Sequence, residues 1–129
     1  MKRENMGERK PIILCVDDED NPLVLRKLVL EKAGYQVLTA NSGTEALRLA
    51  ASQPFDLVLS DHLMPGMTGT ELAEQLKATN PELPILLISG VNEIPLGFHL
   101  ADVFLSKVEG PARMSAKISE VLSQAGKLA

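Results

Sequence analysis

The chain has 129 residues, 45% of them hydrophobic and 23% charged, which is the composition of a single globular domain. Its formal net charge of −4 leaves no excess of Lys and Arg to meet phosphates, which argues against direct nucleic-acid binding. No apolar run is long enough to cross a membrane, and residues 1–10 are too polar for a signal peptide.

Residues 1–10 show no hydrophobic pattern and are expected to be a flexible tail before a domain at 11–125, with 126–129 as the C-terminal end. Five short apolar runs are predicted strands, at 11–16, 35–40, 55–61, 84–90 and 103–107. Cys15 lies inside the first run, so we expect a buried hydrophobic residue rather than a nucleophile. A single cysteine cannot form an internal disulfide, and a location in the reducing cytoplasm is expected.

The segment after the first strand carries helix signals. Asn21 is a candidate N-cap. Val24 with Leu28, and Leu25 with Val29, share a face at i,i+4 spacing and predict the apolar face of this helix.

Three further helices are predicted at the later turns. Ser42 with Glu45, and Thr68 with Glu71, match the capping-box pattern that begins a helix. A last helix is predicted over 111–126. Strands and helices therefore alternate, and the strands are almost continuously apolar. This pattern predicts an α/β fold with a five-stranded parallel sheet, doubly wound, with helices on both faces.

Each of four predicted strands ends at polar residues. Asp17 and Asp18 follow the first strand, Asp61 ends the third, Ser89 ends the fourth and Lys107 ends the fifth. Because the carboxyl ends of parallel strands meet at one edge of a sheet, where α/β proteins bind ligands, we expect these five side chains to lie together.

Three neighbouring carboxylates repel one another unless a cation lies among them or their pKa values rise. Oxygen ligands with no His–Cys pair at metal spacing favour Mg²⁺ over zinc. A lysine and a hydroxyl opposite the acids could stabilise charge on phosphoryl oxygens. The set therefore predicts phosphoryl transfer to a carboxylate.

At these residues the sequence resembles the receiver domain of two-component response regulators, of the chemotaxis-response-regulator type. The resemblance is carried by the acidic pair Asp17-Asp18, "SDHLMPGMTG" around Asp61, "LLISG" at Ser89 and "VFLSK" at Lys107, and it covers about residues 10–123. It implies a flavodoxin-like strand order of 2-1-3-4-5.

The resemblance also implies roles for the residues. Asp61 would be the phospho-acceptor. Asp17, Asp18 and Asp61, with the backbone carbonyl of Leu63, would hold Mg²⁺.

Further roles follow from the same resemblance. Ser89 and Lys107 would contact the phosphoryl group, and Ser89 with Phe104 would form the conformational switch. Leu63 and Val91 occupy the two positions that tune hydrolysis of the acyl phosphate, and both are apolar.

The implied function is two-component signal transduction within a phosphorelay. The donor would be a sensor histidine kinase or a histidine phosphotransfer protein, and phosphorylation would switch a protein-interaction surface. The resemblance implies no turnover enzyme, because such a protein catalyses only its own phosphorylation and dephosphorylation. No output domain is expected within these residues, and the downstream target stays open.

Two alternatives remain. A degenerate receiver would bind partners without being phosphorylated. A small Mg²⁺-dependent phosphohydrolase of the haloacid dehalogenase type would also use a strand-terminal Asp, but that family has a second Asp two residues later, where this chain has Leu63. The sequence shows no second His or Cys at metal-ligand spacing from His62, beside the acceptor, so His62 is interpreted as a packing or surface residue.

The sequence departs from the family pattern after Ser89. Lys107 follows Ser89 by 18 positions, about one helical turn fewer than receivers usually have. Pro95 and Gly97 interrupt what remains. We therefore predict a shortened or irregular fourth helix, a loop or one to two turns, at residues 91–100.

Overall fold

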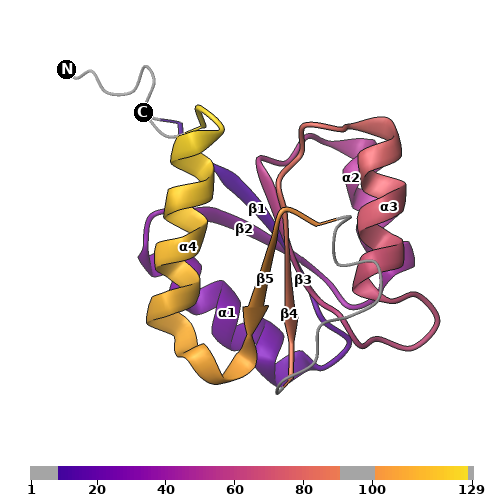
Figure 1. Cartoon of the computed structure of the whole chain (residues 1–129), viewed down its shortest axis with the longest axis horizontal. Helices are drawn as coiled ribbons and strands as arrows, with labels where there is room; N and C mark the ends of the chain where they lie inside the picture. The colour runs from indigo at the N-terminus through magenta and orange to yellow at the C-terminus, as the bar shows by residue number, and fades with distance from the viewer. Residues whose placement is uncertain (1–8, 91–100, 128–129) are drawn as a thin grey trace.

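The computed structural model describes residues 9–90 and 101–127, in which strands and helices alternate (Figure 1). The strands are β1 (Ile12–Val16), β2 (Gln36–Ala40), β3 (Leu57–Asp61), β4 (Ile85–Ser89) and β5 (Val103–Ser106). The helices are α1 (Asp20–Lys32), α2 (Gly43–Ser52), α3 (Gly69–Thr79), α4 (Gly110–Gln124) and the short 3₁₀ helix η2 (Lys107–Glu109). The five strands are parallel in the order β2-β1-β3-β4-β5, so the predicted fold class and strand order are confirmed.

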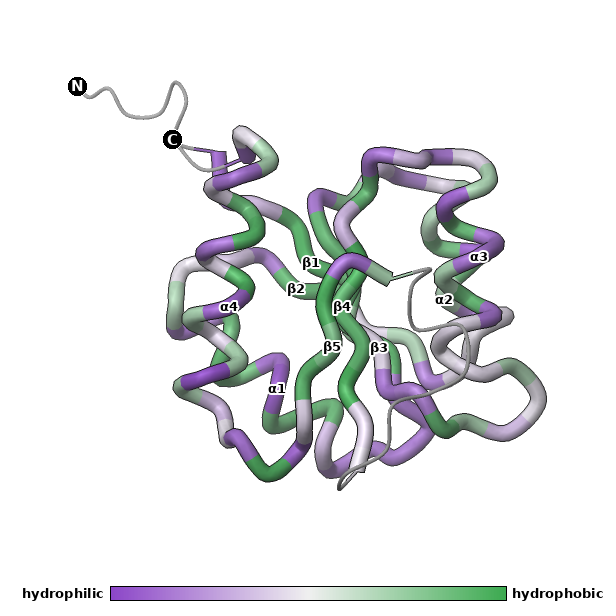
Figure 2. The backbone as a smooth tube through the Cα atoms, in the orientation of Figure 1, coloured by the Kyte–Doolittle hydropathy of each residue, from purple (hydrophilic) through white to green (hydrophobic). Residues whose placement is uncertain are grey.

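Helices cover both faces of the sheet: α1 and α4 lie on one face, and α2 and α3 on the other (Figure 1). Successive strand residues point to opposite faces, so β1 sends Ile13 and Cys15 into the core under α1 and α4, and Leu14 and Val16 into the core under α2 and α3. The strands are hydrophobic along most of their length, while the helices alternate between polar and apolar stretches (Figure 2). Burial on both faces explains why the strands read as continuous apolar runs.

The buried face of α1 differs from the predicted one. Leu23 and Leu30 are its buried residues, whereas Val24, Leu25 and Leu28 each expose more than half of their surface. The apolar face predicted from the i,i+4 pairs is therefore largely wrong. The helix instead buries a stripe with i,i+7 spacing, and most of the predicted face points to solvent.

The helix starts are partly as predicted. Ser42 and Thr68 cap α2 and α3 through their side-chain oxygens, and Thr68 forms a reciprocal capping box with Glu71. The N-cap of α1 is Glu19 rather than Asn21, which lies inside the helix, so that prediction is wrong.

Two carboxylates fasten the amino-terminal edge of the sheet. Asp56, directly before β3, accepts a hydrogen bond from the backbone N–H of Ile12 in β1 at 2.7 Å and pairs with Arg9. Asp102, directly before β5, accepts one from the N–H of Ile85 in β4 at 2.7 Å. In both cases an acid that precedes one strand holds the first amide of the neighbouring strand.

The predicted short helix at 91–100 lies outside the described residues. Among residues 9–90 and 101–127, no helix is both long and apolar enough to span a membrane.

Candidate functional site

The carboxyl-terminal edge of the sheet brings the predicted acids together. Strands β1 and β3 are neighbours, so Asp17 and Asp61 lie side by side, and one carboxylate oxygen from each of Asp17, Asp18 and Asp61 lies within 4.8 Å of the others. Asp17 is 1% exposed and Asp61 is 3% exposed, whereas Asp18 is at the surface. The cluster is thus open on one side and desolvated on the other.

Lys107 lies on the opposite side of Asp61. It follows β5 directly, and its Nζ lies 2.9 Å from Asp61 Oδ1 as an ion pair. Burial raises the pKa of Asp61 above its ordinary value; Lys107 opposes the rise, and the negative charge of Asp17 adds to it. Asp61 and Lys107 are therefore in contact, as predicted. The raised pKa means that the folded protein disfavours the ionised form of Asp61.

Ser89 ends β4, the neighbour of β3, and is 1% exposed. Its Oγ makes no hydrogen bond within the part of the chain that the structure describes, and Asp61 Oδ1 has the ion pair with Lys107 but no aligned hydrogen bond. A buried polar atom without a partner costs free energy. These two oxygens therefore fit a site that takes a polar ligand, and the cluster of carboxylate oxygens fits a hard cation such as Mg²⁺.

An arginine that sequence reasoning missed also reaches this cluster. Arg26 Nη1 lies 2.6 Å from Asp17 Oδ2, while Asp17 Oδ1 accepts a hydrogen bond from the Glu19 backbone N–H at 2.9 Å. Arg26 falls between Leu23 and Leu30 on the buried stripe of α1. A buried charge needs a partner, so the signal that could have found Arg26 is a helix face through Leu23 and Leu30 considered together with the acids that follow β1.

The loop after Asp61 is held close to the strand end. His62 N–H donates to the Ile88 carbonyl at 2.8 Å, and Gly69 N–H donates to the His62 carbonyl at 2.8 Å. A Cβ at position 69 would lie 2.7 Å from the carbonyl oxygen of Asp61, so only glycine allows this approach. His62 is itself buried, in line with the packing interpretation.

The remaining predicted residues lie around this centre or outside the described part. Leu63 is 60% exposed at the rim beyond Asp61. Phe104 in β5 is half-buried against the core under α2 and α3, so its role as a switch stays a prediction. Val91 lies outside the described residues. Cys15 is buried as predicted, and burial raises the pKa of its thiol to about 12.

The comparison with protein families agrees with this geometry. Residues 13–119 match the sequence model of the response regulator receiver domain. The chain belongs to this family. It is 35% identical over 114 residues to the alkaline phosphatase synthesis transcriptional regulatory protein PhoP of Bacillus subtilis, covering 85% of this chain and 48% of that protein. It is 40% identical over 87 residues to the response regulator receiver protein CpdR of Brucella abortus, covering 67% of this chain and 72% of CpdR. The chain thus spans about half the length of several curated relatives, PhoP among them.

Solved receiver structures share the fold. The response regulator protein TrrA of Thermotoga maritima, in complex with Mg²⁺-BeF, superposes with a TM-score of 0.82 at 32% identity, covering 87% of this chain and 99% of that one. A CheY-like receiver domain protein from Methanospirillum hungatei gives a TM-score of 0.85 at 30% identity, covering 92% and 98%.

Proposed function

We propose that this receiver domain accepts a phosphoryl group on Asp61 in two-component signalling. One observation carries the proposal: the buried carboxylate of Asp61 lies within reach of two further acids, Asp17 and Asp18, and forms an ion pair with Lys107. Burial and the negative charge of Asp17 disfavour the ionised carboxylate of Asp61, which would favour its reaction with a phosphoryl group. Lys107 would then neutralise part of the charge on the phosphoryl oxygens.

In the proposed step, a carboxylate oxygen of Asp61 attacks the phosphorus of a phosphohistidine. A P–O bond forms, the P–N bond breaks, and the imidazole leaves with the electron pair and takes up a proton. Lys107 would neutralise charge on the phosphoryl oxygens from one side, and the Ser89 hydroxyl, which has no hydrogen bond among the described residues, would donate to one of them.

The acids Asp17, Asp18 and Asp61, with the backbone carbonyl of Leu63, would hold Mg²⁺. When bound, this ion would supply positive charge to the carboxylates and to the transferring group. Support comes from the oxygen-only donor set within 4.8 Å and from TrrA, a relative whose structure is described as a complex with Mg²⁺-BeF.

The donor would be a sensor histidine kinase or a histidine phosphotransfer protein in the cytoplasm. Sensor histidine kinase GacS of Pseudomonas protegens is 37% identical to this chain over 91 residues, so a similar segment occurs inside a kinase of this class. Phosphorylation would then switch a protein-interaction surface through Ser89 and Phe104.

The test is incubation with acetyl phosphate, with and without Mg²⁺, followed by mass spectrometry of the intact protein and of its peptides. We expect a single Mg²⁺-dependent phosphoryl group on the peptide that contains Asp61. A chain that takes up no phosphoryl group from either acetyl phosphate or a phosphorylated histidine donor would instead be a receiver that acts without phosphorylation.

A further inference from the structure

Arg26 puts a positive charge in the acidic pocket from an unexpected direction. Its side chain comes from the buried stripe of α1 and is only 12% exposed, and its Nη1 meets Asp17 Oδ2 at 2.6 Å. Asp17 is 1% exposed, so this pair is shielded from solvent and is screened less than a surface pair. Arg26 therefore already neutralises one of the three acids that would hold a metal.

Both oxygens of Asp17 are engaged in this arrangement. Oδ1 accepts the backbone N–H of Glu19, which is fixed by the start of α1, and Oδ2 accepts Arg26. The amide cannot leave without disturbing the helix start, whereas a long side chain can rotate. A cation that approaches Asp17 is thus repelled by the guanidinium of Arg26, and of the two partners of Asp17 only the Arg26 side chain can move away.

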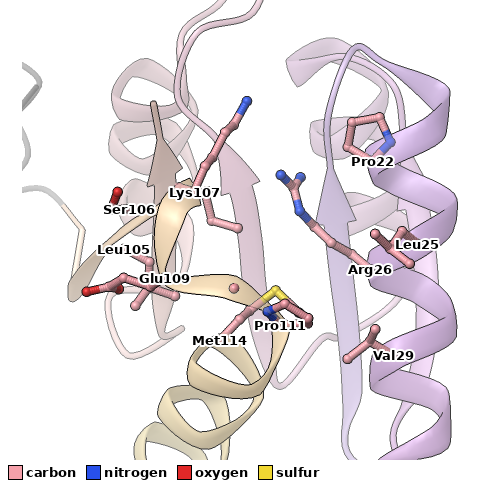
Figure 3. Close-up of a pocket in the computed structure, with 12 residues that line it drawn as sticks. Pro22, Leu25, Arg26, Val29, Leu105, Ser106, Lys107, Glu109, Pro111 and Met114 are labelled. Atoms are coloured by element: carbon pink, nitrogen blue, oxygen red, sulfur yellow. The ribbon is translucent and has the colours of Figure 1, made fainter. Parts of the chain in front are cut away.

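The fold also provides a place for Arg26 to go. A cavity of about 200 Å³ lies between α1 and the segment from β5 to α4. Arg26 and Lys107 extend into it from opposite walls with their charged ends toward the same end, while Met114 lies toward the other end (Figure 3).

We propose that Arg26 is a tethered cation that competes with Mg²⁺ for Asp17: it neutralises Asp17 when no metal is bound, and it rotates away from Asp17, farther into the cavity between α1 and α4, when the metal binds. The proposal rests on the Mg²⁺ site of the proposed function. It makes Arg26 a positioning residue that weakens metal binding and links the metal to the α1–α4 side of the domain.

The test compares Mg²⁺ affinity, by calorimetry without any phosphoryl donor, in the unmodified chain and in Arg26→Gln. Glutamine keeps a donor for Asp17 but loses the charge, so we expect Mg²⁺ to bind about tenfold more tightly, equivalent to about 1.4 kcal/mol. Arg26→Leu, which fits between Leu23 and Leu30, should change affinity in the same direction and serves if the glutamine variant is poorly folded.

The matched control is Arg48→Gln, which lowers the net charge equally but removes an exposed arginine that pairs with Glu45 in α2. We expect its Mg²⁺ affinity to stay at that of the unmodified chain. A second readout follows the Met114 methyl group by NMR during the Mg²⁺ titration. The methyl resonance should shift in the unmodified chain, because Arg26 moves farther into the cavity towards Met114, and shift little in Arg26→Leu.

The outcomes separate the two proposals. Equal Mg²⁺ affinity with and without Arg26, together with normal phosphorylation of Asp61, would overturn the competition and leave the proposed function standing. The same holds if Arg48→Gln tightens binding as much as Arg26→Gln, since the effect would then be one of net charge. Absence of Mg²⁺ binding in every variant would overturn the metal site and the competition with it.

Discussion

Strand β3 carries a buried carboxylate at each end, and the two have opposite surroundings. Asp56, before the strand, is 8% exposed, and Asp61, at its end, is 3% exposed. Asp56 accepts hydrogen bonds from Ile12 N–H at 2.7 Å and from two Arg9 nitrogens at 3.1 and 3.3 Å. Among residues 9–90 and 101–127, Asp61 has one ion pair, with Lys107. Burial alone raises the pKa of both acids, but the bonds from Arg9 and Ile12 bring the pKa of Asp56 below its ordinary value, whereas the pKa of Asp61 stays raised.

The difference separates a carboxylate with a structural role from the one that we propose to be reactive. At the amino edge the chain itself supplies every partner that Asp56 needs, and the acid joins β1 to β3. At the carboxyl edge the described chain leaves Asp61 and Ser89 short of partners, which a ligand would supply. The two carboxylates at the ends of β3 are similarly buried but have different roles, and the number of hydrogen-bond donors around each carboxylate distinguishes the roles.

The largest expected effect concerns phosphorylation. Asp61→Asn should abolish uptake of a phosphoryl group from acetyl phosphate, because the amide is nearly isosteric but not nucleophilic. Asp56→Asn, the same change at the other end of β3, should still be phosphorylated. Intact mass spectrometry measures both. Phosphate on Asp61→Asn would show that the reactive acid has been placed at the wrong end of the strand or elsewhere.

The second prediction concerns stability. Asp56→Ala should lower the free energy of unfolding by about 2 kcal/mol, because it leaves the buried Ile12 N–H without its acceptor. Glu82→Ala, at an exposed acid between α3 and β4, is the control and should change stability little. Urea unfolding measures both. A loss below about 0.5 kcal/mol for Asp56→Ala would mean that this carboxylate does not fasten the amino edge.

The third prediction sharpens the comparison through pH, in metal-free buffer. The pKa of Asp56 is lowered in the folded state, so its stabilisation is present above the ordinary value of 3.8 and is lost as the pH falls through the folded value. The pKa of Asp61 is raised, so its ionised form destabilises the fold at neutral pH. Asp61→Asn should therefore be more stable than the unmodified chain at pH 7, and Asp56→Asn less stable.

The Asp61 difference should shrink as the pH falls from the raised folded pKa towards 3.8, and the Asp56 difference should shrink as the pH falls below 3.8 through the lowered folded pKa. Thermal unfolding at neutral and acid pH gives the readout. If Asp61→Asn is less stable than the unmodified chain at pH 7, then the ion pair with Lys107 fully compensates the cost of burying the charge, and ionised Asp61 does not destabilise the fold.

Much of the carboxyl edge could be predicted from the sequence because strand ends are easy to find. Asp17, Asp61, Ser89 and Lys107 each follow an apolar run, and parallel topology puts all such ends on one edge. The amino edge was harder. Asp56 lies inside the predicted strand at 55–61, and nothing local indicates that its partners are Arg9 and Ile12, more than 40 positions away.

Arg26 was missed for a different physical reason. The i,i+4 apolar pairs predict a buried face of α1 that does not include Arg26. The buried stripe instead follows Leu23, Arg26 and Leu30, and the charge is tolerated in it because Asp17 lies opposite. Such a position is recognised only when the helix face and the acid across from it are considered together.

The smallest expected effect concerns the lifetime of the proposed phosphoryl group, and it tests the side chains next to the carboxyl end of β3. Hydrolysis needs a water in line with the P–O bond, and a polar side chain can orient that water. Leu63, two residues after Asp61, is 60% exposed and apolar, and Val91 was predicted from the sequence as the second apolar position.

We expect slow self-dephosphorylation in the unmodified chain, because neither side chain can hydrogen-bond to the water. Leu63→Asn should speed hydrolysis severalfold, a barrier change of about 1 kcal/mol. The matched control is Leu28→Asn, at a leucine of similar exposure on α1. The measurement is the decay of the Asp61 phosphoryl group after removal of the donor. Equal decay in Leu63→Asn and Leu28→Asn would mean that the rim does not control access of water, and that the stability of the acyl phosphate is set deeper in the site, by Lys107 and Ser89.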